Sequence, residues 1–216
     1  MQEGVERFEK WKVTITENEQ LKKEYMQSQL LGLKSQINPH FLFNSLNTLS
    51  SLINEDEKEA EDFLNQMSKV YRYLLRNNEE ELVTLQTELH FIESYFYLLK
   101  MRHGRGLELQ VDVAPGDMEK LLPPLTLQML IENTLNNNVV TKDEPIVTQI
   151  VSTEGDWLEI RNNIHRKHDE CGLTENIDNI TNKFWLLCQK KVAIIENVDE
   201  RLIRIPLINE TKMHVA

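Results

Sequence analysis

Residues 36–47 of the chain read QINPHFLFNSLN, and an apolar pattern with helical spacing starts inside this stretch. The pattern continues at spacings of four, three and four through Leu42, Leu46, Leu49 and Ile53. Such spacing places apolar side chains on one side of an α-helix. Pro39 lacks a backbone N–H, so either the helix kinks there or a new helix starts with Asn38 as its cap and Pro39 at its first position.

A second helical pattern follows the polar segment 54–57. Its apolar members are Ala60, Phe63, Leu64, Met67, Val70, Tyr71, Leu74 and Leu75. Two helices with a short polar connection predict an antiparallel hairpin. One hairpin cannot enclose its own apolar stripes, so we expect a homodimer in which two hairpins form a four-helix bundle. A third helix is predicted over residues 88–101, with a stop and turn at 103–106.

The second half of the chain alternates strands with helices. Strands are predicted at 107–113, 146–151 and 157–160, and a closing hairpin at 192–195 and 201–205. Helices are predicted at 125–135, with Pro123 and Pro124 tolerated in the first turn, and at 177–187. The fold class is therefore α+β, with helices on one face of a sheet. We place the domain boundary near residue 105, between a helical dimerisation domain (1–105) and an α/β domain (106–216).

The composition restricts the function. The 216 residues carry a formal net charge of −11, which disfavours direct binding to nucleic acid. A nucleotide substrate is still compatible, because Mg²⁺ can offset its charge. No stretch of about 18 apolar residues predicts a membrane span. The two cysteines, Cys171 and Cys188, show no zinc-ligand spacing and fit a reducing compartment. The start of the chain is either native or a cut from a longer protein.

His40 lies on a polar stripe beside the apolar one. On a continuous helix His40, Asn44 and Asn47 fall at positions i, i+4 and i+7. A histidine presented in this way can be reached by another domain. Spacing alone leaves two readings open, since a single histidine on a helix is more often a surface or cap residue.

The whole stretch 36–47 resembles the phosphoacceptor box of the LytS/YehU-type sensor histidine kinases. The resemblance continues through YLLRNN at 73–78 and FIESY at 91–95, and it extends from about residue 21 to residue 206. It implies that ATP phosphorylates His40 and that the phosphate then passes to an aspartate of a response-regulator receiver domain. Histidine suits this role because its neutral ring offers a nucleophilic nitrogen near pH 7. Phe41 follows His40, so the base must come from elsewhere, and Glu132 is the candidate.

The stretch LPPLTLQMLIEN at 122–133 resembles the family's N box. By this resemblance Asn133 ligates Mg²⁺ and Glu132 acts near the transferred phosphate. Oxygen ligands suit a hard cation, and phosphoryl transfer needs charge neutralisation. The resemblance also implies an ATP pocket whose binding residues are Asn133, Asn137, Asn162 and Gly172.

Several positions depart from the family pattern. Asn136-Asn137-Asn138 stands where a histidine and a small residue are usual, and Asn162 replaces the aspartate that reads adenine. An amide oxygen can still accept a hydrogen bond there, but it carries no charge. In the lid, aligned on Asn176, Cys171 and Leu173 replace the two glycines that allow close approach to phosphate.

Two functions therefore compete. The first is a kinase core with an ATPase-type α/β sandwich, the cytoplasmic portion of an inner-membrane protein whose membrane segment is absent from this chain. The second is a degenerate kinase that has lost ATP binding and serves as a dimerisation or signalling scaffold. The box at His40 favours the first function, and the altered lid favours the second.

Overall fold

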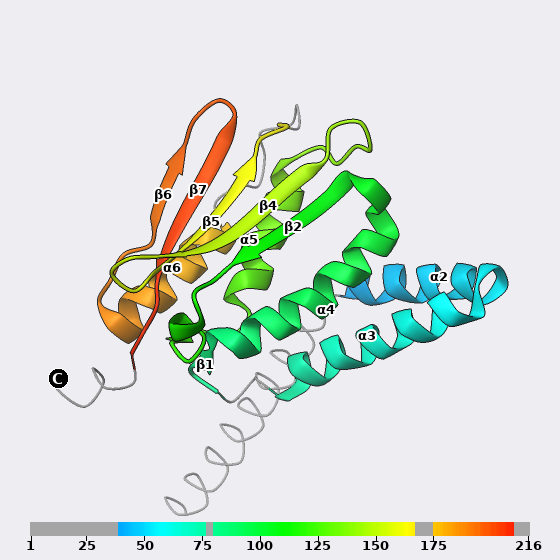
Figure 1. Ribbon diagram of the computed structural model, residues 1–216, viewed down its shortest axis with the longest axis horizontal. Helices are drawn as coiled ribbons and strands as arrows, with labels where there is room; N and C mark the ends of the chain where they lie inside the picture. Colours follow the sequence, from blue (N-terminus) through cyan, green and yellow to red (C-terminus); the bar gives the residue numbers. More distant parts are fainter. Residues whose placement is uncertain (1–38, 77–79, 167–174, 210–216) are drawn as a thin grey trace, which may run out of the picture. The chain divides into compact units, whose positions relative to one another are not determined.

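The computed structural model describes residues 39–76, 80–166 and 175–209 (Figure 1). The chain divides into two compact units, residues 1–47 and 48–216, and helix α2 (Pro39–Glu55) crosses their junction. Each unit is described by itself. Asn38, the predicted cap, lies outside the described residues. Among the described helices, none combines the length and the apolar character that a bilayer span requires.

Helix α3 (Glu57–Arg76) follows α2 after the single residue Asp56. The Asp56 side chain accepts a hydrogen bond from the Glu59 N–H at 3.0 Å, which caps the new helix. The predicted break at 54–57 is therefore confirmed. The buried residues of α3 recur at helical spacing and are Ala60, Phe63, Met67, Val70 and Leu74.

Helix α4 (Leu85–His103) connects the helical part of this unit to its sheet. The Thr84 side chain caps its first turn, and Gly104, at φ 60°, ends it where the sequence predicted a stop. Helix α3 packs along one side of α4, while α5 (Thr126–Asn137) and strand β2 (Leu107–Asp112) contact another. Tyr73 stacks on Phe91 with ring centroids 4.2 Å apart. The α3 stripe is thus buried against α4, a packing that the hairpin prediction did not include.

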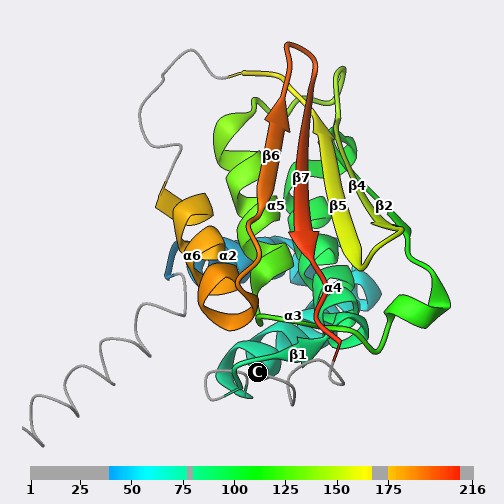
Figure 2. The same ribbon diagram turned by 90° about the vertical axis from the view of Figure 1, so that its left-hand side faces the viewer.

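The main sheet has five strands in the order β2-β4-β5-β7-β6. Its other strands are β4 (Ile146–Thr153), β5 (Trp157–Asn163), β6 (Ala193–Glu196) and β7 (Glu200–Pro206). Among the described strands only β2 and β4 pair in parallel, and α5 lies in the crossover between them. Figure 2 shows α5, α4 and α6 (Glu175–Cys188) on one side of this sheet, as predicted. A second, two-stranded sheet joins β1 (Val83–Thr84) to β3 (Leu121–Leu122).

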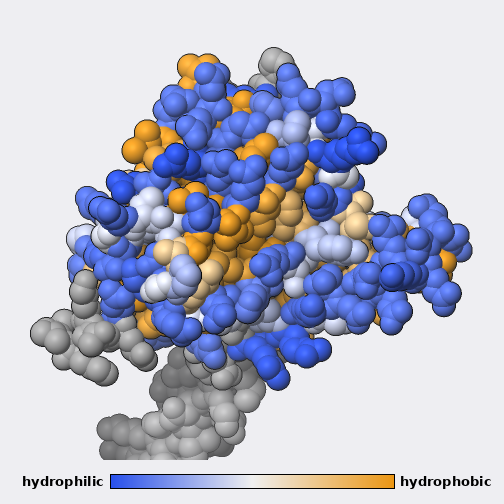
Figure 3. All heavy atoms as spheres, in the orientation of Figure 1, coloured by the Kyte–Doolittle hydropathy of each residue, from blue (hydrophilic) through white to orange (hydrophobic). Residues whose placement is uncertain are grey.

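The core of residues 48–216 lies between the sheet and these helices. It includes Leu107, Ile146, Ile150, Leu158, Ile203 and Ile205 from the strands and Leu127, Leu130, Ile131, Ile180 and Phe184 from α5 and α6. In Figure 3 apolar atoms reach the surface between β2, an edge strand, and α4. The α+β class is confirmed, whereas the four-helix bundle and the domain boundary near residue 105 stay predictions.

The start of α5 differs from the prediction. Pro123 and Pro124 precede the helix as predicted, but α5 begins at Thr126, one residue later than predicted, after the cap residue Leu125. Leu125 has φ 65° and ψ 10°, a left-handed conformation that is uncommon for a leucine. This turn redirects the chain from β3 into the helix that carries Glu132 and Asn133.

Candidate functional site

His40 lies in the first turn of α2, and its side chain is exposed. The Asn44 side-chain nitrogen lies 3.2 Å from each of the two ring nitrogens of His40. An amide N–H can donate to a ring nitrogen that carries no proton, and the tautomer decides which nitrogen that is. The predicted polar stripe therefore exists, with Asn44 one turn after the histidine. An exposed ring held in this way can be approached by a second molecule or domain.

Helix α5 carries the predicted base, Glu132. The Glu132 Oε1 atom accepts hydrogen bonds from the Tyr95 hydroxyl at 2.8 Å and from the Gln128 side chain at 3.0 Å. Burial raises the pKa of Tyr95 well above its ordinary value, and the nearby Glu132 raises it further. Tyr95 thus remains a neutral donor at physiological pH. The hydrogen bond orients Glu132 toward α4.

Asn133, the predicted metal ligand, faces the sheet and is only 4% exposed. Its Oδ1 atom accepts a hydrogen bond from Arg201 Nη1 at 2.7 Å and another from Asn137 Nδ2 at 3.1 Å. The structure thus brings together two of the predicted nucleotide residues, Asn133 and Asn137. It adds Arg201, which the sequence analysis did not single out. The available signal was a charge at an inward position of β7, in register with the buried Ile203 and Ile205.

Arg201 is held by a short chain of charges. Its Nε atom lies 3.4 Å from Glu196 Oε2, and Glu196 Oε1 accepts from Arg166 Nη2 at 2.7 Å. Burial lowers the pKa of Arg201, while the charge of Glu196 raises it. A guanidinium nevertheless stays protonated at neutral pH, because its ordinary pKa lies so high. A permanent cation therefore touches the Asn133 oxygen.

This arrangement does not fit a divalent cation on Asn133. A carbonyl oxygen has two lone pairs, and two N–H donors already approach this one. Across residues 39–76, 80–166 and 175–209 there is also no cluster of three or more histidine, cysteine, aspartate or glutamate side chains suited to a metal ion. Coordination through Asn133 would require Arg201 to move away.

Asn162, at the expected adenine-reading position, lies on the inner face of β5 and is 3% exposed. Its Oδ1 accepts from the Thr134 hydroxyl at 3.3 Å, and its Nδ2 donates to the Asn163 carbonyl at 2.7 Å. Asn162 thus ties β5 to α5. The amide oxygen proposed to accept from adenine is engaged by the protein itself.

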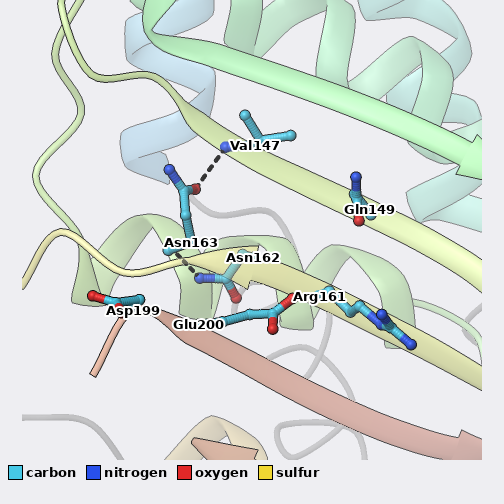
Figure 4. Close-up of a pocket in the computed structure, with 7 residues that line it drawn as sticks. All are labelled: Val147, Gln149, Arg161, Asn162, Asn163, Asp199 and Glu200. Carbon is cyan, nitrogen blue, oxygen red and sulfur yellow. Dashed lines mark hydrogen bonds between the residues drawn. The ribbon is translucent and has the colours of Figure 1, made fainter. Parts of the chain in front are cut away.

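A shallow cavity of about 240 Å³ lies over β4 and β5 on the outer face of the sheet, opposite α5 (Figure 4). Its lining residues are Val147, Gln149, Arg161, Asn162, Asn163, Asp199 and Glu200. Asn163 closes one side by accepting a hydrogen bond from the Val147 N–H at 2.8 Å. Two carboxylates against one guanidinium favour groups that donate hydrogen bonds over phosphate oxygens.

Two other parts of the predicted pocket are the asparagine run at 136–138 and the lid around Gly172. Asn138 joins the end of α5 to the segment after β5, since its side chain accepts from the His165 N–H at 2.6 Å and donates to the Thr134 carbonyl at 2.8 Å. The asparagine run therefore includes a structural tie. Gly172, with the neighbouring positions 171 and 173 of the predicted lid, lies outside the described residues.

The N-terminus of α5 is held by Glu88, a second residue that sequence reasoning missed. The Glu88 carboxylate is fully buried and accepts from the Leu125 N–H at 2.7 Å, the Leu127 N–H at 3.1 Å and the Tyr73 hydroxyl. Burial raises its pKa, although these hydrogen bonds and the charge of Lys183 lower it. A glutamate at the start of an apolar helical run was the available signal. Glu88 thereby links α3, α4 and the helix that carries Glu132 and Asn133.

Comparison with known proteins shows which family this chain is similar to. Residues 28–107 match the family model described as histidine kinase. The chain is 30% identical over 138 residues to the sensor protein LytS of Staphylococcus saprophyticus, and 31% identical over 144 residues to that of Bacillus cereus. The alignments cover 60% and 67% of this chain but 23% and 24% of those relatives. The chain thus spans about a quarter of their length.

Among solved structures, the histidine kinase AdeS of Acinetobacter baumannii is similar over 74% of this chain and 84% of that one. The sequence identity is 15% and the TM-score is 0.41. A likeness at this level carries no argument about the site.

Proposed function

We propose that this chain, a relative of the LytS-type sensor histidine kinases, is the phosphoacceptor and nucleotide-domain region of a two-component sensor kinase. The observation that carries the proposal is the family match over residues 28–107, which includes the exposed His40 and its box. The function within a cell would be the transfer of phosphate from ATP to His40, and then to an aspartate of a response regulator. The chain would act as the cytoplasmic portion of an inner-membrane protein, with the membrane segment elsewhere.

The chemistry is a phosphoryl transfer in two steps. An unprotonated ring nitrogen of His40 attacks the γ-phosphorus of ATP, so an N–P bond forms while the bond to ADP breaks. The other ring nitrogen releases its proton, and Glu132 is the proposed acceptor. In the second step an aspartate carboxylate of the regulator takes the phosphoryl group as the N–P bond breaks, and a proton returned to the ring from solvent restores the imidazole. Asn44, one turn from His40, would hold the ring in a defined orientation.

The nucleotide would enter beside α5, near Asn162, on the face of the sheet opposite the cavity that Asp199 and Glu200 border. Gly172 remains the proposed lid glycine. The Asn133 oxygen is held by Arg201, so no step of this proposal passes through a metal ion.

Dimerisation is part of the same proposal. Large apolar side chains of α2 and α3 are exposed in the single chain, and they are Phe43, Leu46, Ile53, Leu64 and Leu75. The three on α2 are spaced by three and seven residues, which places them on one side of that helix. A second copy of the chain would cover them.

The test is phosphorylation of His40→Gln against a matched control. The chain is incubated with radiolabelled ATP and Mg²⁺, and acid-labile protein phosphate is measured. We expect label in the native chain and in His90→Gln, which changes an exposed histidine on α4, and none in His40→Gln. Label that persists in His40→Gln would move the phosphoacceptor to another residue.

A second candidate is a non-catalytic scaffold, which the contact between Arg201 and Asn133 favours. In that case the chain would dimerise and receive phosphate on His40 only from an active kinase. Calorimetry separates the two. The kinase proposal expects weak heat on ATP addition, and tighter binding when Asn162→Asp, Cys171→Gly and Leu173→Gly are combined. If millimolar ATP produces neither heat nor a thermal shift, even in the combined variant, the kinase proposal fails and the scaffold remains as the candidate function.

A further inference from the structure

We propose that Arg201 is a built-in cation that competes with a divalent metal ion for Asn133 Oδ1, and that it thereby sets the metal affinity of the nucleotide site. The inference rests on the proposed function only in treating Asn133 as a nucleotide-site residue. Its observation is the 2.7 Å hydrogen bond from Arg201 Nη1 to Asn133 Oδ1, between β7 and α5.

The position of Arg201 is built into the sheet. Along β7 the inward positions are Arg201, Ile203 and Ile205, and all three are buried. Glu196 pairs with Arg201 across the β6–β7 ladder, and its carboxylate lies beside the guanidinium. The pairing directs the guanidinium inward, to the same side of the sheet as α5. The side chain is 10% exposed, so its contact with Asn133 is shielded from water.

A guanidinium and a divalent cation cannot share this oxygen. Mg²⁺ demands close octahedral oxygen ligands, and a carbonyl that accepts from two N–H donors has no lone pair left for it. A second cation would also meet the charge of Arg201 in a region where water screens charge poorly. Binding of the metal therefore requires Arg201 to leave Asn133.

Displacement of Arg201 from Asn133 costs the free energy of their hydrogen bond. The hydrogen bond is charge-assisted, a class about twice as strong as a neutral hydrogen bond. Glu196 is already bonded to Arg166, so a displaced Arg201 gains little from turning toward that carboxylate. The site should therefore bind divalent metal weakly as long as Arg201 is present. Removing the guanidinium should release the Asn133 oxygen.

The experiment measures Mn²⁺ binding by electron paramagnetic resonance, with the full 216-residue chain and with ADP present, because the cation needs phosphate oxygens in addition to one amide oxygen. Arg201→Met keeps an apolar stem without a charge, and Glu196 keeps its partner Arg166, so no buried charge is left alone. We expect this variant to bind Mn²⁺ roughly ten- to a hundredfold more tightly than the native chain. Arg201→Lys, which retains a cation, should stay close to the native affinity.

A double variant identifies the ligand. In Arg201→Met combined with Asn133→Ala the gained affinity should disappear, because the released oxygen is gone. Arg201→Gln serves as a second uncharged variant if the methionine form does not fold, and circular dichroism checks each protein. Equal Mn²⁺ affinity in the native chain and in the uncharged variant would overturn the inference, and so would a gain that survives loss of Asn133.

Failure of this inference is separable from failure of the proposed function. His40→Gln should leave Mn²⁺ binding unchanged, whereas it should abolish phosphorylation. If Arg201→Met tightens Mn²⁺ binding but no phosphate appears on His40, the inference about Arg201 stands and the proposed phosphoacceptor role of His40 fails.

Discussion

Replacement of Glu88 should reveal how strongly the N-terminus of α5 is anchored. The carboxylate is 0% exposed and accepts from two backbone N–H groups, of Leu125 and Leu127, and from the Tyr73 hydroxyl. A buried polar group left without a partner costs about 1–3 kcal/mol. Glu88→Ala strands several such donors, and the gain from no longer burying a carboxylate offsets part of the loss. We expect the free energy of unfolding to fall by about 3–5 kcal/mol.

Glu88→Gln provides the finer measurement. The glutamine side-chain oxygen can replace one carboxylate oxygen as an acceptor. Its NH₂ group takes the place of the other oxygen and faces a hydrogen-bond donor, which it cannot accept from. We expect a loss of about 1–2 kcal/mol, smaller than that of the alanine variant. Urea unfolding followed by circular dichroism gives both values. Glu93→Gln and Glu93→Ala, at an exposed position of the same helix, are the matched controls.

The pH dependence of Glu88→Gln follows from the raised pKa of the native carboxyl. Because the folded state holds this proton more tightly than the unfolded chain, the stability that protonation contributes is complete below the ordinary pKa of 4.5. It is lost as the pH rises through the folded-state pKa. The difference in stability between the native chain and Glu88→Gln should therefore be largest below pH 4.5 and should narrow at higher pH. A difference that widens with pH would refute the raised pKa of Glu88, whereas a Glu88→Ala variant as stable as Glu93→Ala would refute the anchoring role.

Two further predictions concern association and backbone strain. Leu46→Glu should weaken the predicted dimer, because it places a charge in an apolar seam. Leu186→Glu, at an exposed position of α6, is the control and should leave the dimer intact. Light scattering at micromolar concentration measures the association of both variants. A native chain that is monomeric would contradict the bundle. Leu125→Val should destabilise the chain by about 1–2 kcal/mol more than Leu135→Val, since a β-branched side chain tolerates a positive φ poorly. Equal thermal shifts for the two variants would show that the left-handed turn stores no strain.

The elements themselves could be read from the sequence because their signals are local. Spacings of three and four predicted α3, and alternation predicted β2 and β7. The helix stop after His103 was predicted from glycine, and Gly104 ends α4 at φ 60°. The predicted start of α5 was one residue too early, because nothing in the sequence announces the left-handed conformation of Leu125. His40 was found through its box, and its partner Asn44 follows from helical geometry alone.

The tertiary structure decided which polar groups meet. Arg201 and Asn133 are 68 positions apart in the chain, and Glu88 and Leu125 are 37 apart. Strand alternation could place Arg201 on the inner face of β7, but only the packing of α5 on the sheet puts the Asn133 oxygen within reach. The reason is physical: periodicity depends on neighbours a few residues away, whereas a buried polar atom must be satisfied by whichever partner the assembled layers bring to it. The sequence by itself therefore determined the helices, the strands and the exposed histidine, and the fold decided that a guanidinium holds the predicted metal ligand.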